Sequence, residues 1–202
     1  MSRALALLSD RRGGSAVEFA LALPLLFMLM FGLIDAGRFM WEYNEAEKAT
    51  QMGVRYAVAT KLIPGQAFAD YSFATSAGIP QGTAVPTSEF DKVTCTESSC
   101  SCTGGTICSS VALDSTAFAG LVKRMNAMYG SVKAANVEVE YRNVGLGYSG
   151  DPNGPDVAPL VTVRLRALTF RPLSCMYFMC NVVMPSFRAA LTLEDGAGTK
   201  SN

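Results

Sequence analysis

The stretch Ala16–Ile34 constrains this chain more than any other feature, because its 19 residues include a single charge, Glu18. As an α-helix it would measure ~28 Å at about 1.5 Å per residue, which matches the roughly 30 Å hydrocarbon core of a bilayer. A secretory signal would end in a small-residue cleavage site, and residues 35–38 (DAGR) fit that pattern poorly. A buried helix of a soluble domain would rarely follow Arg11-Arg12 and stay so apolar. A retained single-pass membrane anchor is therefore the favoured interpretation.

The charges around this stretch predict its orientation. Arg3, Arg11 and Arg12 precede it, against one acidic residue, Asp10. Because basic residues flanking a span stay on the cytoplasmic side, we expect a cytoplasmic N-terminus. Everything after Asp35 should then lie on the other side of the membrane.

The overall composition excludes several classes of function. The 17 basic and 17 acidic residues cancel, so bulk charge gives no reason to expect a nucleic-acid partner. The chain has no histidine, which removes histidine bases, histidine-activated nucleophiles and histidine metal ligands. An enzyme would need a carboxylate or lysine site, and the sequence has no P-loop, Gly-x-Ser-x-Gly or paired-carboxylate motif. We therefore expect a protein that is not an enzyme and has no catalytic residues, cofactor or metal.

Glu18 lies just inside the apolar stretch, where a carboxylate is costly. In one interpretation its side chain reaches toward the lipid headgroups. In the other, it neutralises a positive charge at membrane depth, since an intramembrane carboxylate usually has a partner. If the chain is cut after Gly13, the new α-amino group of Gly14 is such a charge, four residues away on the same chain or closer on a neighbour.

The residues around Glu18 also match a processing pattern. Residues 13–19 (GGSAVEF) resemble the cleavage site of type IV prepilins, in which a glycine precedes the cut and a glutamate is fifth in the mature chain. The wider segment from Arg11 to Ala59 is similar to the TadE-like family, which comprises minor pilins or pseudopilins of the tight-adherence (Flp-type) pilus. The matching elements are Arg11–Gly14, Ala16–Ala20, Pro24, Gly32, Gly37–Arg38 and Gly53–Ala57.

The resemblance implies that a prepilin peptidase cuts after Gly13, or after Gly14 one residue further, and that Glu18 and Phe19 act in assembly. It implies a prepilin in a bacterial inner membrane, with a periplasmic C-terminal domain, needed to build the pilus. The implied partners are the prepilin peptidase, the major and other minor pilins, and the inner-membrane assembly platform, without nucleic acid. The runner-up hypothesis is an unprocessed membrane-anchored periplasmic scaffold or binding module. A pseudopilin of type II secretion is an alternative within the first class.

The helix should continue past the membrane, because no helix-ending signal occurs between Arg38 and Leu62. We expect one helix from Ser15 to Leu62, ~70 Å long at about 1.5 Å per residue and ended by Pro64-Gly65. The small residues in its second half fit two interpretations: packing on the chain's own domain, or close approach to another helix. The candidates for helix packing are Pro24, Gly32, Gly37, Ala46, Ala49, Gly53 and Ala57.

The residues beyond this helix predict an α+β domain with a small antiparallel sheet. Residues 65–115 show little periodicity, so only short elements are expected there. Ser115–Tyr129 has the spacing of an amphipathic helix. Its apolar side would be Phe118, Leu121, Val122, Met125 and Met128. Strands are predicted at Asn136–Asn143 (half-buried), at Val157–Phe170 (longer) and at Ser186–Leu193.

Six cysteines follow the membrane segment: Cys95, Cys100, Cys102, Cys108, Cys175 and Cys180. An even number on the exported side argues for disulfides, since the periplasm is oxidising. Proximity favours Cys175–Cys180 and two bridges within 95–108, without fixing which. The alternative, a cysteine-only zinc site at 95–108, lacks the paired Cys-x2-Cys spacing. The apolar segment Cys175–Met184 either packs on the sheet or forms an exposed patch for a partner pilin or the membrane surface.

Together these features divide the chain into four parts. We expect residues 14–38 to form a transmembrane helix, and the resemblance implies that residues 1–13 are a prepilin-like leader. Residues 39–63 should continue this helix into the periplasm, and 64–202 should form a disulfide-containing α+β domain.

Overall fold

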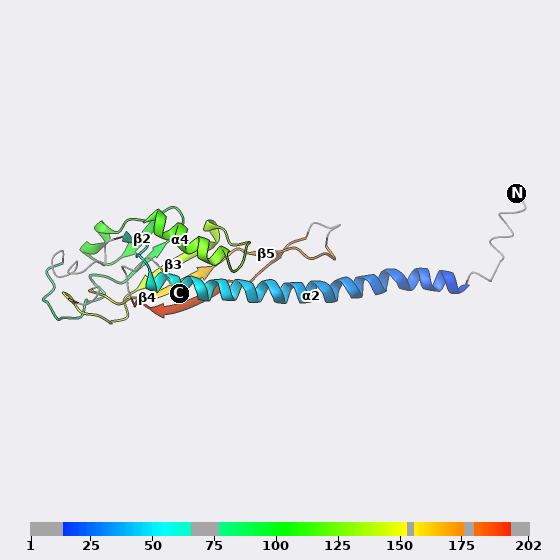
Figure 1. Cartoon of the computed structure of the whole chain (residues 1–202), viewed down its shortest axis with the longest axis horizontal. Coiled ribbons are helices and arrows are strands. Elements are labelled where there is room, and N and C mark those ends of the chain that lie inside the picture. Colours follow the sequence, from blue (N-terminus) through cyan, green and yellow to red (C-terminus); the bar gives the residue numbers. More distant parts are fainter. Residues whose placement is uncertain (1–13, 66–76, 153–155, 176–179, 195–202) are drawn as a thin grey trace, which may run out of the picture. The chain divides into compact units, whose positions relative to one another are not determined.

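A computed structural model describes residues 14–65, 77–152, 156–175 and 180–194. Its elements are numbered in chain order, and Figure 1 labels several of them. The chain divides into two compact units, which we name the N-terminal unit and the C-terminal unit. The N-terminal unit consists of Met1–Trp41 and Phe170–Val182, and the C-terminal unit consists of Glu42–Thr169 and Val183–Asn202.

Helix α2, Gly14–Ala59, has 46 residues and confirms the long helix predicted from the sequence. Pro24 lies inside it and has no N–H to donate to the helix ladder. Beyond the helix, Gly65 donates its N–H to the carbonyl oxygen of Leu62 at 3.3 Å and has a φ of +74°. Because side chains disfavour that conformation, the turn after the helix requires a glycine there.

The C-terminal unit contains a five-stranded antiparallel sheet in the order β2-β1-β3-β4-β7. Its strands are β1 (Lys92–Cys95), β2 (Cys100–Thr103), β3 (Val137–Arg142), β4 (Leu160–Leu165) and β7 (Phe187–Thr192). Two shorter strands, β5 (Thr169–Phe170) and β6 (Val182–Val183), pair with each other. With two 3₁₀ segments, η3 (Thr106–Ser110) and η4 (Ala134–Asn136), these elements form the predicted α+β fold.

Helix α4, Ser115–Asn126, is capped by the preceding residue, Asp114. Asp114 Oδ1 accepts hydrogen bonds from the backbone N–H groups of Thr116 and Ala117, both at 3.0 Å, which satisfies two helix donors that have no partner inside the helix. Lys61 Nζ lies 2.6 Å from Asp114 Oδ2. The hydrogen bond with Lys61, followed by those from the backbone, lowers the pKa of the Asp114 carboxyl from its ordinary value.

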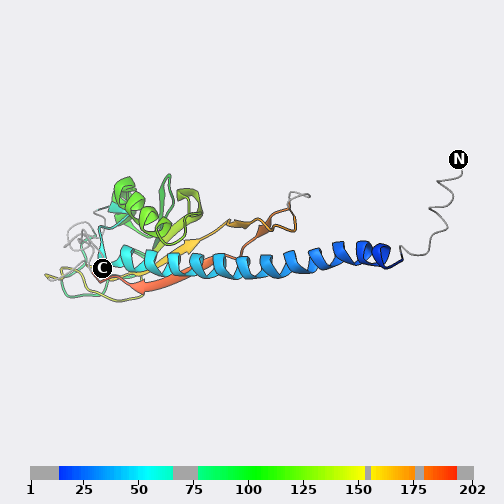
Figure 2. The same cartoon turned by 45° about the vertical axis from the view of Figure 1, so that its right-hand side comes forward.

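One face of the sheet packs within the C-terminal unit against α2 and α4, which lie side by side in Figure 1 and Figure 2. The two helices approach closely at Gly53, where an added Cβ would lie only 2.8 Å from Met125 Sδ. The rings of Tyr43 and Phe187 meet edge to face at 4.8 Å. The buried residues of the central strands on this face are Val137, Val139, Tyr141, Val161, Val163 and Leu165.

The strand predicted at Val157–Phe170 is wrong in its length. Strand β4 ends at Leu165, and Ala167 then adopts a φ of +55°. This left-handed conformation interrupts the extended backbone. Thr169 and Phe170 therefore belong to a different strand, β5.

The strand predicted as half-buried is buried on both faces from Val137 to Tyr141. Its outward-facing carboxylates, Glu138 and Glu140, are covered by arginine side chains from β3, β4 and the residue after β4. The predicted apolar side of α4 is also one residue too long. Because the helix ends at Asn126, Met128 lies beyond it and is 41% exposed.

Candidate functional site

The first part of α2 presents an apolar surface. Every side chain from Gly14 to Ile34 is exposed except that of Leu23, which is partly exposed. Among the described residues, α2 is the one helix long and apolar enough to cross a membrane. Lipid or the apolar surface of a partner is the environment that such a helix face needs.

Glu18 and Phe19 lie in the second turn of α2, and both side chains are exposed. Gly14 is the first residue of the helix, whereas Gly13 and the rest of the predicted leader lie outside the described residues. A Cβ added to Gly14, Gly32 or Gly37 would meet no described atom within 4 Å. Packing inside the described chain therefore gives no reason for a glycine at these three positions.

The packing candidates in the second half of α2 have a different environment. Ala46, Ala49, Gly53 and Ala57 are all buried in the C-terminal unit. Gly53 faces Met125 of α4. Of the two interpretations of this small-residue stripe, its burial favours packing on the chain's own domain.

A feature that the sequence did not reveal lies where the apolar stretch of α2 ends. Residues 170–182, which we name the disulfide arm, belong to the N-terminal unit and contain the Cys175–Cys180 disulfide. Asp35 is 7% exposed, and its carboxylate accepts hydrogen bonds from the backbone N–H groups of Leu173 at 2.6 Å and Ser174 at 2.8 Å. The sequence signals were an acidic residue directly after the apolar stretch and the apolar segment Cys175–Met184, and neither identifies the other as its partner.

Arg38, one turn after Asp35, completes this contact. Its Nη1 lies 3.4 Å from Asp35 Oδ1 and donates to the carbonyl oxygen of Arg171 at 3.4 Å. Its guanidinium carbon lies 5.2 Å from the ring centroid of Phe170, within cation–π range. The ring of Phe39 meets the same Phe170 ring edge to face at 5.5 Å. Polar and aromatic contacts thus fix the base of the disulfide arm to α2.

The other four cysteines form the disulfides Cys95–Cys100, which joins β1 to β2, and Cys102–Cys108, which joins β2 to η3. These bonds assign the pairs that proximity alone left open. Because the six cysteine sulfurs are paired in three disulfides, none is available as a metal ligand. No other group of three or more acidic or cysteine residues in the described ranges could hold a metal ion.

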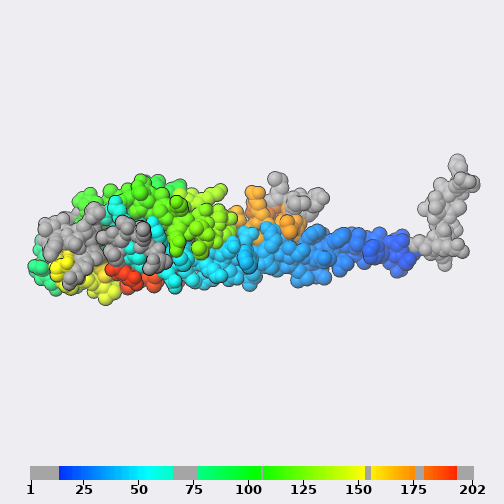
Figure 3. Space-filling model, viewed as in Figure 1, coloured from blue at the N-terminus to red at the C-terminus, as the bar shows by residue number. Residues whose placement is uncertain are grey.

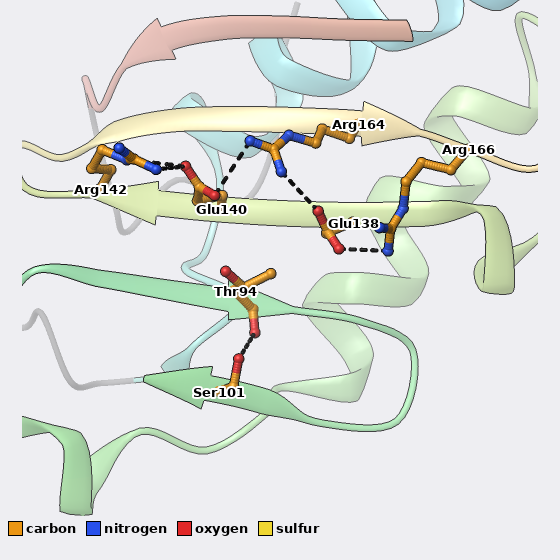
Figure 4. Close-up of polar contacts among 7 residues, drawn as sticks. All are labelled: Thr94, Ser101, Glu138, Glu140, Arg142, Arg164 and Arg166. Atoms are coloured by element: carbon orange, nitrogen blue, oxygen red, sulfur yellow. Dashed lines mark hydrogen bonds and ion pairs between the residues drawn. The ribbon is translucent and has the colours of Figure 1, made fainter. Parts of the chain in front are cut away.

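The outer face of the sheet has an ion-pair network between two glutamates and three arginines, shown in Figure 4. Arg164 Nη1 lies 3.2 Å from Glu138 Oε1, and its Nη2 lies 3.4 Å from Glu140 Oε2. Arg142 pairs with Glu140 at 3.1 Å, and Arg166 pairs with Glu138 at 2.5 Å. Each buried carboxylate therefore has two cationic partners, which is the arrangement that buried charges need.

One N-terminal apolar helix followed by a disulfide-bonded domain is consistent with a single-pass membrane protein whose folded part lies outside the cytoplasm. Residues 13–55 match the family model of the TadE-like proteins, so this segment is a TadE-like family domain. The family is pilin-like, is associated with the tight-adherence pilus and is generally non-enzymatic. No curated protein and no solved structure matches the chain significantly.

Proposed function

We propose that this protein is a minor pilin or pseudopilin that acts in the assembly of a tight-adherence pilus. It is made as an inner-membrane prepilin with a cytoplasmic N-terminus, and a prepilin peptidase processes it after Gly13. The observation that supports this most is the TadE-like match over residues 13–55, which begins at the proposed scissile glycine and ends inside α2. Its partners are the peptidase, the major and other minor pilins and the inner-membrane assembly platform.

The role of Glu18 follows from the charge that processing creates. A cut after Gly13 leaves the α-amino group of Gly14 at the start of α2, four residues before Glu18. In a hydrocarbon environment an unpaired ammonium group is costly, so a carboxylate on a neighbouring chain lowers the free energy of packing. The exposed Glu18 and the apolar surface from Phe19 to Ile34 are both accessible to such a neighbour.

The exported domain is suited to an oxidising compartment. Three disulfides lie in the part of the chain beyond the apolar stretch. Disulfides persist in the bacterial periplasm and at the cell surface but are rare in the cytosol. This agrees with the orientation that the basic N-terminal residues predict.

N-terminal sequencing of the protein isolated from membranes tests processing, with surface pili counted in the same strain. We expect a mature chain that begins at Gly14. Glu18→Ala should abolish surface pili while cleavage continues, because the substitution removes the partner of the new ammonium group. Glu47→Ala is the matched control, since Glu47 is an exposed glutamate further along the same helix. A mature protein that retains Met1–Gly13, or normal piliation in Glu18→Ala, would contradict the proposal.

One observation supports the runner-up, an unprocessed membrane-anchored scaffold or binding module. A groove of about 660 Å³ lies beside α4 in the C-terminal unit, and its lining includes Phe118, Val122 and Lys123. A binding module would use such a groove and would not depend on Glu18. Retention of residues 1–13 together with normal pili in Glu18→Ala is the result expected from this alternative.

A further inference from the structure

Arg38 of α2 and the described residues 171–173, 175, 180 and 181 of the disulfide arm line a partly open pocket of about 460 Å³ in the N-terminal unit. Figure 3 shows the described residues of the arm, in orange, lying against the light-blue part of α2. The charged side chains of the lining are those of Arg38 and Arg171. Pro172, Leu173 and the Cys175–Cys180 disulfide form the apolar part of the wall. Two guanidinium groups next to an apolar wall suit an amphiphilic anion.

The charge around the pocket is positive. Residues 170–182 contain one charged residue, Arg171. From Phe19 to Gly37 the one charged residue of α2 is Asp35, whose carboxylate is already bonded to two backbone N–H groups of the arm and to Arg38. Over residues 19–41 and 170–182, these one acidic and two basic groups leave a net charge of +1, and the next charged residue of α2 is Glu42.

The position of the pocket along α2 corresponds to the membrane surface. The apolar stretch ends at Ile34, and Arg38 follows it by four residues, or about 6 Å at about 1.5 Å per residue. With the stretch spanning the hydrocarbon core, Arg38 lies at the depth of the lipid phosphates. Trp41, 68% exposed, follows one turn later, where tryptophan is enriched at membrane interfaces.

We propose that this pocket binds the headgroup of an anionic phospholipid in the outer leaflet of the inner membrane. The guanidinium groups of Arg38 and Arg171 contact the lipid phosphate, and Leu173, which is 44% exposed, contacts the glycerol and upper acyl chain. The arm thereby fixes the depth at which α2 leaves the membrane. This inference rests on the membrane anchoring of the proposed function.

The test uses the full chain purified in a neutral detergent, with the fluorescence of its single tryptophan, Trp41, as the signal. Three probes are titrated: short-chain phosphatidylglycerol, short-chain phosphatidylcholine and inorganic phosphate. We expect a saturable change with phosphatidylglycerol, a weaker one with phosphatidylcholine and none with phosphate. Arg171→Gln and Arg38→Gln should each weaken phosphatidylglycerol binding about fivefold, the effect expected for one basic residue near an anionic headgroup.

Two controls separate the pocket from general electrostatics and from loss of structure. Arg188→Gln removes an exposed arginine of β7 in the C-terminal unit and should leave lipid binding unchanged. Arg171→Lys keeps the positive charge and, since lysine and arginine contribute alike near an anionic headgroup, should bind within about twofold of wild type. Hydrogen exchange of peptides that contain Leu173 and Ser174 verifies that the arm stays bound to Asp35 in each variant, so that loss of the arm is not mistaken for loss of the lipid contact.

Several results would overturn the proposal. One is equal binding of the two lipids by the wild-type chain; another is saturation by inorganic phosphate as tight as by phosphatidylglycerol, which would make this a free-anion site. If Arg171→Gln binds lipid normally but loses the major pilin on co-purification, the arm is a protein contact instead. Release of the wild-type chain from membranes by alkaline carbonate would overturn the anchor itself, whereas an integral chain without lipid preference would overturn only the lipid site.

Discussion

Asp35 joins α2 to residues that are far away in the sequence. Leu173 and Ser174, whose N–H groups it accepts, are 138 and 139 residues further along the chain. A buried carboxylate is costly unless it is hydrogen-bonded, and these two donors and Arg38 meet that need. The sequence places Asp35 at the end of an apolar stretch, but no local pattern identifies partners at that separation.

Asp114 shows the opposite case, a residue whose role follows from local chemistry. Replacing it by alanine should destabilise the chain by about 1 kcal/mol, the usual value of a helix N-cap, because two N–H groups of α4 lose their acceptor. Its lowered pKa adds a pH dependence. The contribution is complete above 3.8, the ordinary pKa, and is lost as the pH falls through the lower folded-state pKa. Thermal unfolding of the full chain in detergent, followed by circular dichroism, measures both effects.

Asn is the matched substitution at this position, because it caps helices about as well as Asp but has no charge to pair with Lys61. Asp114→Asn should therefore retain most of the stability at neutral pH and lose this residue's share of the acid dependence. Equal destabilisation by Asp114→Asn and Asp114→Ala would show that the ion pair with Lys61, and not the cap, is the main contribution.

At the scale of elements, the alternation of apolar residues predicts which face of a strand is buried. It fails for residues whose burial depends on contacts with a distant strand. Alternation correctly places Val137, Val139 and Tyr141 on one buried face of β3. The same alternation assigns Glu138 and Glu140 to solvent, and they are buried. Their burial depends on the cross-strand register of β3 with β4, which sets Glu138 opposite Arg164. Register is a property of the pair of strands, so it cannot be deduced from either strand alone.

Arg164 should contribute more to the stability of the sheet than Arg188, the arginine paired with it on the neighbouring strand β7. It contacts both buried glutamates, so Arg164→Met leaves two carboxylates with one cationic partner each. Because its side chain is about one-third exposed, we expect a loss of about 1–3 kcal/mol, below the range for fully buried pairs. Arg188 lies directly opposite on the edge strand β7, and Arg188→Met should change stability by less than about 0.5 kcal/mol. Urea unfolding of the two variants in detergent gives the comparison, and equal losses would show that the network adds nothing.

At the scale of the whole molecule, composition and cysteine number indicate the class of the protein. They do not indicate how the chain divides into its two units. The apolar stretch, the α+β domain and the disulfides all follow from patterns within the chain. The sequence did not predict that residues 170–182 would belong to the same unit as residues 1–41. That association depends on Asp35, Arg38 and Phe39, and sequence spacing does not specify which distant segment they contact.

The two units have separate disulfides, so removing one bond should affect one unit only. Cys102–Cys108 lies in the C-terminal unit and closes a loop with a sequence separation of 6, which the chain-entropy model values at about 2 kcal/mol. The double substitution of these two cysteines by serine should lower the stability of that unit by this amount. The same substitution at Cys175 and Cys180 should leave it unchanged.

Hydrogen exchange followed by mass spectrometry resolves the two units in one experiment. In the Cys175/Cys180 double variant we expect faster exchange in peptides that contain Leu173 and Ser174, because the arm holds their N–H groups against Asp35. Peptides from β3 and β4 should exchange as in wild type. Faster exchange across the sheet would mean that the arm and the C-terminal unit unfold together. The disulfide arm would then be part of the folded domain's stability, and its effect on the membrane contact could not be separated from folding.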